Sequence, residues 1–209
     1  IGPYDNGTDD IGFTGAMIDF LEMDYAVNSS RIYACGFSLG GNFVWDLACY
    51  LGDRFAAVSS VAASMWQWTL EECTSNHRVG ILSIHGTNDF YNPYNGNQYS
   101  ISMNQLSEHW VSKNGSEGTP VTSQFAPGVT RFLWNRGDAC YAGEGEGGGG
   151  EAQEDPRCQG QRIYSYLSWR ANSVLVSHYA FNSIYISTLR AIPQAFAGGF
   201  FSYFLLLQI

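Results

Sequence analysis

Length, composition and charge limit what this chain can be. Its 209 residues suit one domain, since single domains commonly reach about 200 residues and such a chain buries a substantial core. The 45% hydrophobic and 15% aromatic residues, against 14% charged ones, are typical of a globular protein rather than a disordered one. Ten basic and nineteen acidic residues give a net charge of -9, which repels phosphate backbones and anionic lipids. We therefore expect no nucleic-acid partner.

Helical and strand-like patterns alternate along the first half of the chain. In chain order, we predict a helix over 9–24, a strand over 31–36, a helix over 40–52, strands over 56–62 and 79–84, a helix over 99–113 and a further strand within 124–134. This alternation predicts an α/β protein with a mostly parallel sheet, flanked by helices on both faces. Its site is expected in loops at the carboxyl ends of the strands.

The character of the sequence changes after Arg136. Residues 143–150 read GEGEGGGG, which is a flexible linker by composition. We predict a catalytic core over 1–136, a linker over 137–162 and a divergent apolar segment over 163–209. The apolar tail over 195–207 is shorter than the ~20 residues that a membrane-spanning helix needs, so we expect no stable membrane insertion.

Cysteines and glycosylation sequons indicate the compartment. Five cysteines allow two disulfides with one thiol left over, and they lack the CxxC spacing of a zinc site, so we expect neither a metal nor another cofactor. They are Cys35, Cys49, Cys73, Cys140 and Cys158. Together with three Asn-x-Ser/Thr sequons, beginning at Asn6, Asn28 and Asn114, they favour an extracellular glycoprotein. No signal peptide is visible from Ile1, so we expect the chain to be truncated at its N-terminus.

The strongest motif is a GxSxG turn at residues 36–40. It lies between a predicted strand and a predicted helix, which is the context of a nucleophile elbow. Ser38 is then the nucleophile, and the backbone N–H of Leu39 supplies half of an oxyanion hole. The alternative is a glycine-rich turn whose serine caps a helix.

A serine nucleophile needs a general base, and the base needs a carboxylate. In this fold the order along the chain is serine, acid, histidine. Asp89, in IHGTND over 84–89, follows a buried strand and is the predicted acid, although an aspartate in a polar turn is often only structural.

Four histidines are candidates for the base. His77 and His85 precede Asp89, and we expect His85 to be buried in the core. His109 falls within a predicted helix beside Trp110. His178 follows a strand-like run late in the chain and is the positional candidate for the base.

Two tryptophans, Trp66 and Trp68, follow the predicted strand over 56–62. We predict that they line an acyl or aryl pocket on the sheet edge that carries Ser38, with simple structural burial as the alternative.

Residues 9 to about 115 resemble the polyhydroxybutyrate depolymerase and feruloyl esterase family of secreted α/β-hydrolases. The matching motifs are DDIGF over 9–13, RIYACGFSLGG over 31–41, DRFAA over 53–57, IHGTND over 84–89, Pro93-Tyr94, Trp110 and Asn114-Gly115. The resemblance implies a carboxylic ester hydrolase that works through an acyl-enzyme on a polyester or on a hydroxycinnamoyl ester of a polysaccharide. Ser38 matches the family nucleophile and Asp89 its acid.

The chain departs from this family in two places. The family carries a second oxyanion donor in an HG-type turn upstream of the segment that begins at Ile1, and its histidine lies in a GGGHxW turn. Here Gly147–Gly150 is followed by Glu151, so His178 is not a motif match. Two other hypotheses therefore stay open, namely a serine peptidase of the same fold and an inactive fragment. On this basis we expect the 209-residue chain to be weakly active or inactive.

Overall fold

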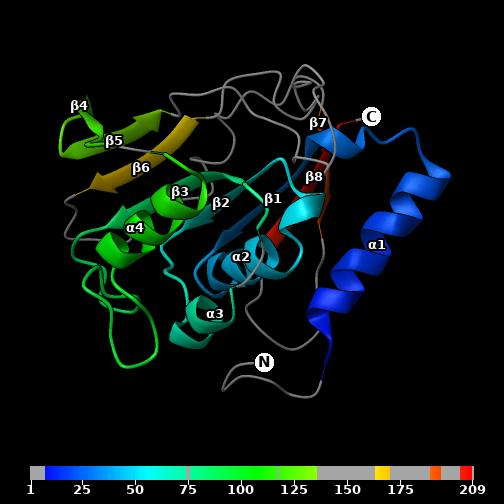
Figure 1. Cartoon of the computed structure of the whole chain (residues 1–209), viewed down its shortest axis with the longest axis horizontal. Coiled ribbons are helices and arrows are strands. Elements are labelled where there is room, and N and C mark those ends of the chain that lie inside the picture. The colour runs from blue at the N-terminus through cyan, green and yellow to red at the C-terminus, as the bar shows by residue number, and fades with distance from the viewer. Residues whose placement is uncertain are drawn as a thin grey trace, which may run out of the picture.

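The computed structural model describes residues 8–73, 76–116, 118–135, 163–169, 189–193 and 203–208. These residues form one eight-stranded sheet in the order β4-β5-β6-β3-β2-β1-β8-β7, accompanied by helices (Figure 1). The helices are α1 (Asp10–Asp24), η1 (Ser29–Arg31), α2 (Leu39–Tyr50), η2 (Gly52–Arg54), α3 (Gln67–Glu72) and α4 (Met103–Lys113). The strands are β1 (Ile32–Phe37), β2 (Ala57–Val61), β3 (Gly80–Gly86), β4 (Val121–Ala126), β5 (Val129–Asn135), β6 (Ile163–Trp169), β7 (Leu189–Pro193) and β8 (Tyr203–Gln208).

Parallel pairing is confined to the centre of the sheet. Strands β1, β2, β3 and β6 run parallel, whereas β8 pairs antiparallel with β1 and β5 pairs antiparallel with β6. The α/β class is therefore confirmed, but the prediction of a mostly parallel sheet holds only for this central block. Strands β6, β7 and β8 come from the segment after residue 162 and belong to the same sheet.

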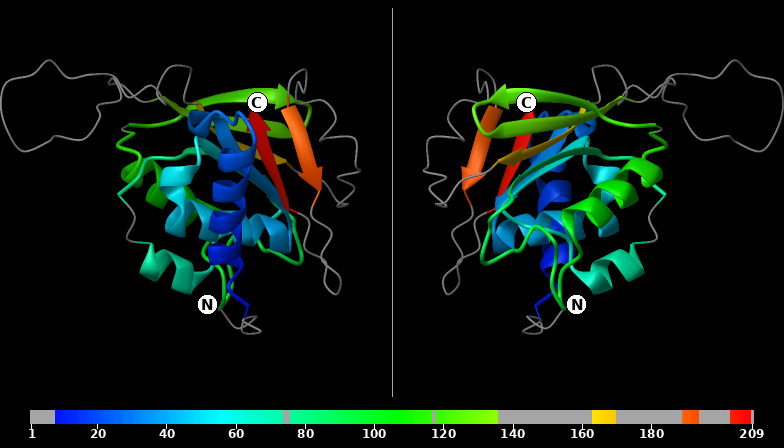
Figure 2. Two further views of the ribbon diagram at one scale, coloured as in Figure 1. Left: turned by 90° about the vertical axis from the view of Figure 1, so that its right-hand side faces the viewer. Right: turned by 90° about the vertical axis from the view of Figure 1, so that its left-hand side faces the viewer.

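The described helices α1 to α4 lie on one face of the sheet, as both views of Figure 2 show. For α2, α3 and α4, which follow β1, β2 and β3 in the chain, the reason is topological, since the chain moves in one direction across the sheet from β1 through β2 and β3 to β6. Right-handed crossovers in one direction place every connecting helix on the same face. The prediction of helices on both faces is therefore not met by the described helices. The core lies between the helices and this face, and it includes Ala34, Val58, Ile81, Val44, Leu47, Trp45 and Leu106.

Local capping sets the helix starts. The Asp9 carboxylate accepts a hydrogen bond from Gly12 N–H at 2.8 Å, which satisfies one of the open donors of α1. Ser102 and Gln105 form a capping box at the start of α4. The sequence predicted that helix from residue 99, but Asn97 Oδ1 accepts from the backbone N–H of Ser100 and holds the preceding residues in a turn.

A hairpin occupies the segment around 124–134, within which the sequence predicted a further strand. β4 and β5 pair antiparallel and are joined by Pro127-Gly128, with Gly128 at a φ of 74°. Proline followed by glycine at positive φ is the pairing that type II turns favour. The strand predicted within 124–134 corresponds to β5, and its hairpin partner β4 was not predicted.

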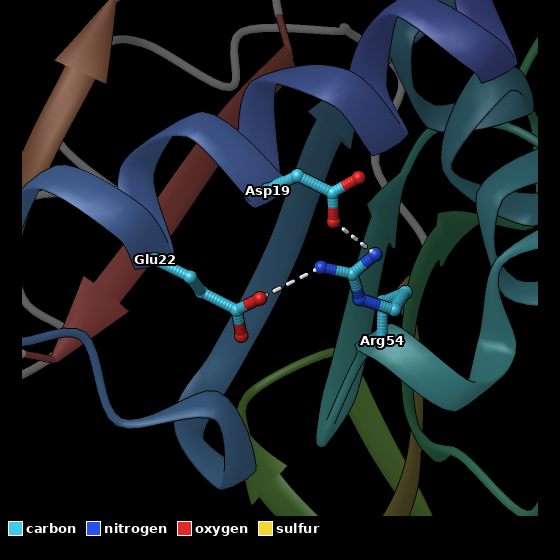
Figure 3. Close-up of polar contacts among 3 residues, drawn as sticks. All are labelled: Asp19, Glu22 and Arg54. Carbon is cyan, nitrogen blue, oxygen red and sulfur yellow. Dashed lines mark hydrogen bonds and ion pairs between the residues drawn. The ribbon is translucent and has the colours of Figure 1, made fainter.

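Arg54 joins α1 to the chain that follows α2. Its guanidinium contacts Asp19 at 2.7 Å and Glu22 at 2.8 Å, one turn apart on α1 (Figure 3). All three side chains are partly exposed, and ion pairs at a protein surface each contribute at most about 1 kcal/mol to folding stability. The buried contacts of Ile18 and Leu21 with the core therefore dominate the attachment of α1.

A disulfide joins α2 to the end of α3, between Cys49 and Cys73. This is one of the two expected disulfides. Cys35 is buried in β1, while Cys140 and Cys158 lie outside the described residues. Among the described helices, none has the length and apolar character needed to cross a membrane.

Candidate active site

Ser38 occupies a sharp turn between β1 and α2. Its backbone has a φ of 53° and a ψ of -122°, which non-glycine residues rarely adopt. Such a conformation costs of order 1–3 kcal/mol and persists only where neighbouring contacts fix it. The predicted strand, strained turn and helix are all present. The Ser38 side chain makes no capping hydrogen bond to α2, which argues against the helix-capping alternative.

The absence of a side chain at Gly36 permits this turn. A Cβ at Gly36 would lie 2.2 Å from the carbonyl oxygen of Gly40 and 2.8 Å from the backbone nitrogen of Gly41. A Cβ at Gly41 would lie 2.7 Å from the Ser60 hydroxyl. The strand and the first turn of the helix therefore touch through backbone atoms, as the glycines of the motif predict.

Hydrogen bonds to β2 and to the residues after it hold the turn in place. Ser38 N–H donates to the carbonyl of Val61 at 2.9 Å, and the Asn42 amide donates to the carbonyl of Ser64 at 2.6 Å. Asn42 is fully buried, and the Ser64 hydroxyl in turn donates to the carbonyl of Ile101 at 2.7 Å. No local sequence pattern predicts this network, because it joins residues far apart in the chain.

Leu39 is the first residue of α2. The first N–H groups of a helix have no acceptor within it, and they carry the positive end of the helix dipole. The Leu39 N–H is therefore one of these donors, in the residue that directly follows Ser38. Ser38 itself is half-buried, so part of this residue is exposed to solvent.

Asp89 lies in the turn that follows β3. Asp89 N–H donates to the Gly86 carbonyl at 3.2 Å, and the carboxylate Oδ1 accepts from the N–H groups of Tyr91 and Asn92, both at 2.9 Å. No described residue donates to the other oxygen, Oδ2. One carboxylate oxygen thus holds the loop, and the second is left for another partner.

Ser38 and Asp89 emerge at the same edge of the sheet. β1, β2 and β3 are parallel and in register, with Phe37 opposite Val61 and Val61 opposite Ile84. The two turns follow strands two places apart, which corresponds to about 10 Å across the sheet. The side chains and one imidazole can span such a gap, so the prediction that Asp89 shares the sheet edge of Ser38 is correct.

A short relay connects the two turns through the end of β2. Asn92 Nδ2 donates to the carbonyl of Ala62 at 2.9 Å, next to the Val61 carbonyl that receives Ser38 N–H. Ala62 also has a positive φ, of 52°. Asn92 is therefore a positioning residue, which the sequence reasoning did not identify.

His85 lies close to the Asp89 loop, but its ring contacts the backbone of that loop rather than the Asp89 carboxylate. It is fully buried, as predicted, and its Nε2 lies 2.8 Å from the Asn92 carbonyl. A carbonyl only accepts, so Nε2 carries the proton and donates it there. Burial lowers the pKa of His85 and keeps the ring neutral. His85 thus fixes the Asp89 loop and does not serve as the base.

The other described histidines lie away from this edge. His77 is exposed and precedes β3, at the opposite edge of the sheet. His109 packs beside Trp110 and lies within 4.8 Å of the Cys49 and Cys73 sulfurs. Cys49 is near the far end of α2, about 16 Å along the helix from Ser38. His178, the predicted base, lies outside the described residues.

One group of metal-ligand types occurs among the described residues, formed by Cys49, Cys73 and His109. The two sulfurs are joined in the disulfide and offer no thiolate, which is the form that binds metals. The group is therefore not a metal site in this state.

Trp66 and Trp68 stack on each other at 5.0 Å between ring centroids. Trp66 precedes α3 and Trp68 lies within it, so the pair sits on a helix that the sequence reasoning missed. Both rings are half-buried, and Gln67 between them is bonded to Asn97 and Tyr99. The structure places the pair beyond the carboxyl end of β2, on the loop side of the sheet.

Comparison with known proteins gives relatives for part of the chain. It is 33% identical over 117 residues to a probable feruloyl esterase C of Aspergillus clavatus, a match that covers 56% of this chain and 39% of that protein. It is 29% identical over 172 residues to feruloyl esterase B of Piromyces equi, covering 74% of this chain and 31% of that protein. A bifunctional acetylxylan esterase/xylanase of Neocallimastix patriciarum is 28% identical over 128 residues, covering 61% and 18%.

No family model matches the chain. The matched part spans about two fifths or less of these relatives. Their names agree with the feruloyl esterase side of the resemblance, and the polyhydroxybutyrate side remains a prediction. The chain is thus similar, over about half of its length or more, to proteins named as esterases.

Proposed function

We propose that this chain is a serine carboxylic ester hydrolase of the α/β-hydrolase fold, acting on hydroxycinnamoyl esters of a polysaccharide. The observation that carries the proposal is the strained turn of Ser38, at a sheet edge shared with Asp89. The names of the relatives support a polysaccharide ester over the polyester alternative. The disulfide supports an extracellular location.

In the proposed reaction the Ser38 hydroxyl attacks the ester carbonyl and passes its proton to a histidine. Asp89, through its second carboxylate oxygen, holds that histidine in the correct tautomer. The Leu39 N–H stabilises the negative oxygen of the tetrahedral intermediate. The protonated histidine gives its proton to the leaving alcohol, and water then hydrolyses the acyl-enzyme by the same route. His178 remains the candidate for this base. The stacked Trp66 and Trp68 are proposed to bind the aryl part of the substrate.

Covalent labelling tests the nucleophile independently of turnover. A fluorophosphonate probe should label the chain at Ser38, and Ser38→Ala should abolish the label. Ser107→Ala provides the matched control, since Ser107 donates only to the Met103 carbonyl within α4. Labelling at another serine, or equal labelling of Ser38→Ala, would refute the assignment.

Substrate assays separate the ester hydrolase from the other two hypotheses. Methyl ferulate and p-nitrophenyl acetate should be hydrolysed, while a peptide p-nitroanilide should not. Preference for the peptide substrate would instead indicate a peptidase. Absence of both labelling and hydrolysis would identify the chain as an inactive fragment.

A further inference from the structure

Two aromatic side chains beside the candidate site have no role in the proposed reaction. Phe90 and Tyr91 are 84% and 82% exposed, the highest values among the large apolar side chains of the described residues. They follow directly after Asp89, at the edge of the sheet that carries Ser38. Exposed aromatic groups rimmed by polar residues mark interaction sites more often than single exposed apolar residues do.

The loop that carries these rings is held rigidly. The backbone N–H of Tyr91 donates to Asp89 Oδ1, and Asn92 is bonded both to that carboxylate and to the Ala62 carbonyl. The rings of Phe90 and Tyr91 meet edge to face, with centroids 5.6 Å apart. Because the backbone is already fixed, a ligand that rests on the rings loses little binding energy to ordering the loop.

We propose that Phe90 and Tyr91 form a platform that binds the sugar rings of a neutral, xylan-type polysaccharide beside the reacting ester. This inference rests on the proposed function and names the part of its substrate that this loop would hold. Sugar rings present flat C–H faces that pack on aromatic rings, and Tyr91 also carries a hydroxyl that can hydrogen-bond to a sugar. The net charge of -9 disfavours an acidic polymer and leaves a neutral one unaffected.

The platform is distinct from the Trp66 and Trp68 pair. Those rings stack face to face around the start of α3, whereas Phe90 and Tyr91 project from the loop after β3. In this arrangement the acyl group and the sugar chain of the substrate contact different loops of the same sheet edge. Loss of the platform should therefore affect the polymer far more than a small ester.

Binding to soluble neutral arabinoxylan, measured by affinity gel electrophoresis and calorimetry, tests the platform without requiring turnover. The 209-residue chain should bind, and the Phe90→Ala/Tyr91→Ala double variant should lose about tenfold or more in affinity. Losses of that size accompany removal of aromatic rings on which planar ligands stack. Tyr91→Phe, which keeps the ring, should retain most of the affinity. Phe20→Ala is the matched control, because Phe20 is an exposed aromatic residue on α1. Its affinity should match that of the unaltered chain.

The outcomes separate this inference from the proposed function. If the unaltered chain does not bind arabinoxylan, or if the double variant binds as tightly with an unchanged melting temperature, the platform is refuted. Preferential binding to polyhydroxybutyrate particles would also refute the choice of a sugar polymer. Labelling of Ser38 is measured in parallel. Loss of arabinoxylan binding in the double variant, in a chain whose Ser38 does not label, would sustain the platform and refute only the esterase.

Discussion

Replacing Gly36 by alanine tests whether the contact between β1 and α2 creates the Ser38 turn. The new Cβ would lie 2.2 Å from the oxygen and 2.3 Å from the carbon of the Gly40 carbonyl. Both are backbone atoms, so no side chain can rotate away, and the start of α2 must shift. Overpacking of this kind costs about 1–3 kcal/mol or more. A displacement near 1 Å at a reacting group can reduce a rate by about 100-fold.

The matched control is Gly15→Ala in α1. A Cβ there meets only the Leu51 methyl groups, at 3.9 and 4.0 Å, and alanine is favoured over glycine within helices by about 0.5–1 kcal/mol. Urea unfolding should thus show Gly15→Ala as stable as the unaltered chain or more so, and Gly36→Ala as less stable. The rate of fluorophosphonate labelling should fall in Gly36→Ala alone. Unchanged stability together with unchanged labelling in Gly36→Ala would refute the close contact.

Three further predictions concern stability and positioning. Burial raises the pKa of Asp46 from 3.8 to about 6, so the folded chain binds this proton more tightly than the unfolded chain does. Stability should fall by up to ~3 kcal/mol as pH rises from 4 to 6, and urea unfolding of Asp46→Asn should show a weaker fall. The Cys49→Ser/Cys73→Ser variant opens a loop of 24 residues and should lose ~3 kcal/mol in the same assay, where an unchanged midpoint would contradict the estimate. Asn92→Ala should slow ester turnover and Ser38 labelling together, because it loosens the Asp89 loop that would position the base; unchanged rates of both would refute this positioning role.

The elements that the sequence predicts well are those with local signals. The Asp9 cap, the glycines around Ser38 and the apolar run of β3 act on neighbouring residues, so their element boundaries are close to those predicted. α3 was missed because its six residues are too few to show a helical period. The placement of the helices on one face of the sheet depends on the order of the strands in space, and the sequence pattern does not reveal that order.

The candidate site likewise has residues that local sequence signals predict and residues that they do not. Ser38 and Asp89 follow strands whose carboxyl ends must share an edge once those strands are parallel, so chain order alone indicates their placement. Asn92 and Ala62 are 30 residues apart, and nothing in the local sequence of either indicates their hydrogen bond. The base is the hardest component to predict, because its candidate, His178, lies far along the chain from Ser38 and no motif surrounds it.

The backbone conformation of Ser38 is held by contacts that do not involve a histidine. The contacts that sustain the strained turn come from the Gly36 approach to Gly40, the Val61 carbonyl and the Asn42 bond to Ser64. All of these belong to residues 36–64, so the turn is fixed within one strand-helix-strand unit. A serine held in this way beside the first N–H of a helix has one donor for an oxyanion whether or not a histidine is near. The base must still activate the Ser38 hydroxyl, for fluorophosphonate labelling as for attack on an ester. His178→Ala should therefore slow both reactions if His178 is the base, and should leave both unchanged if it is not.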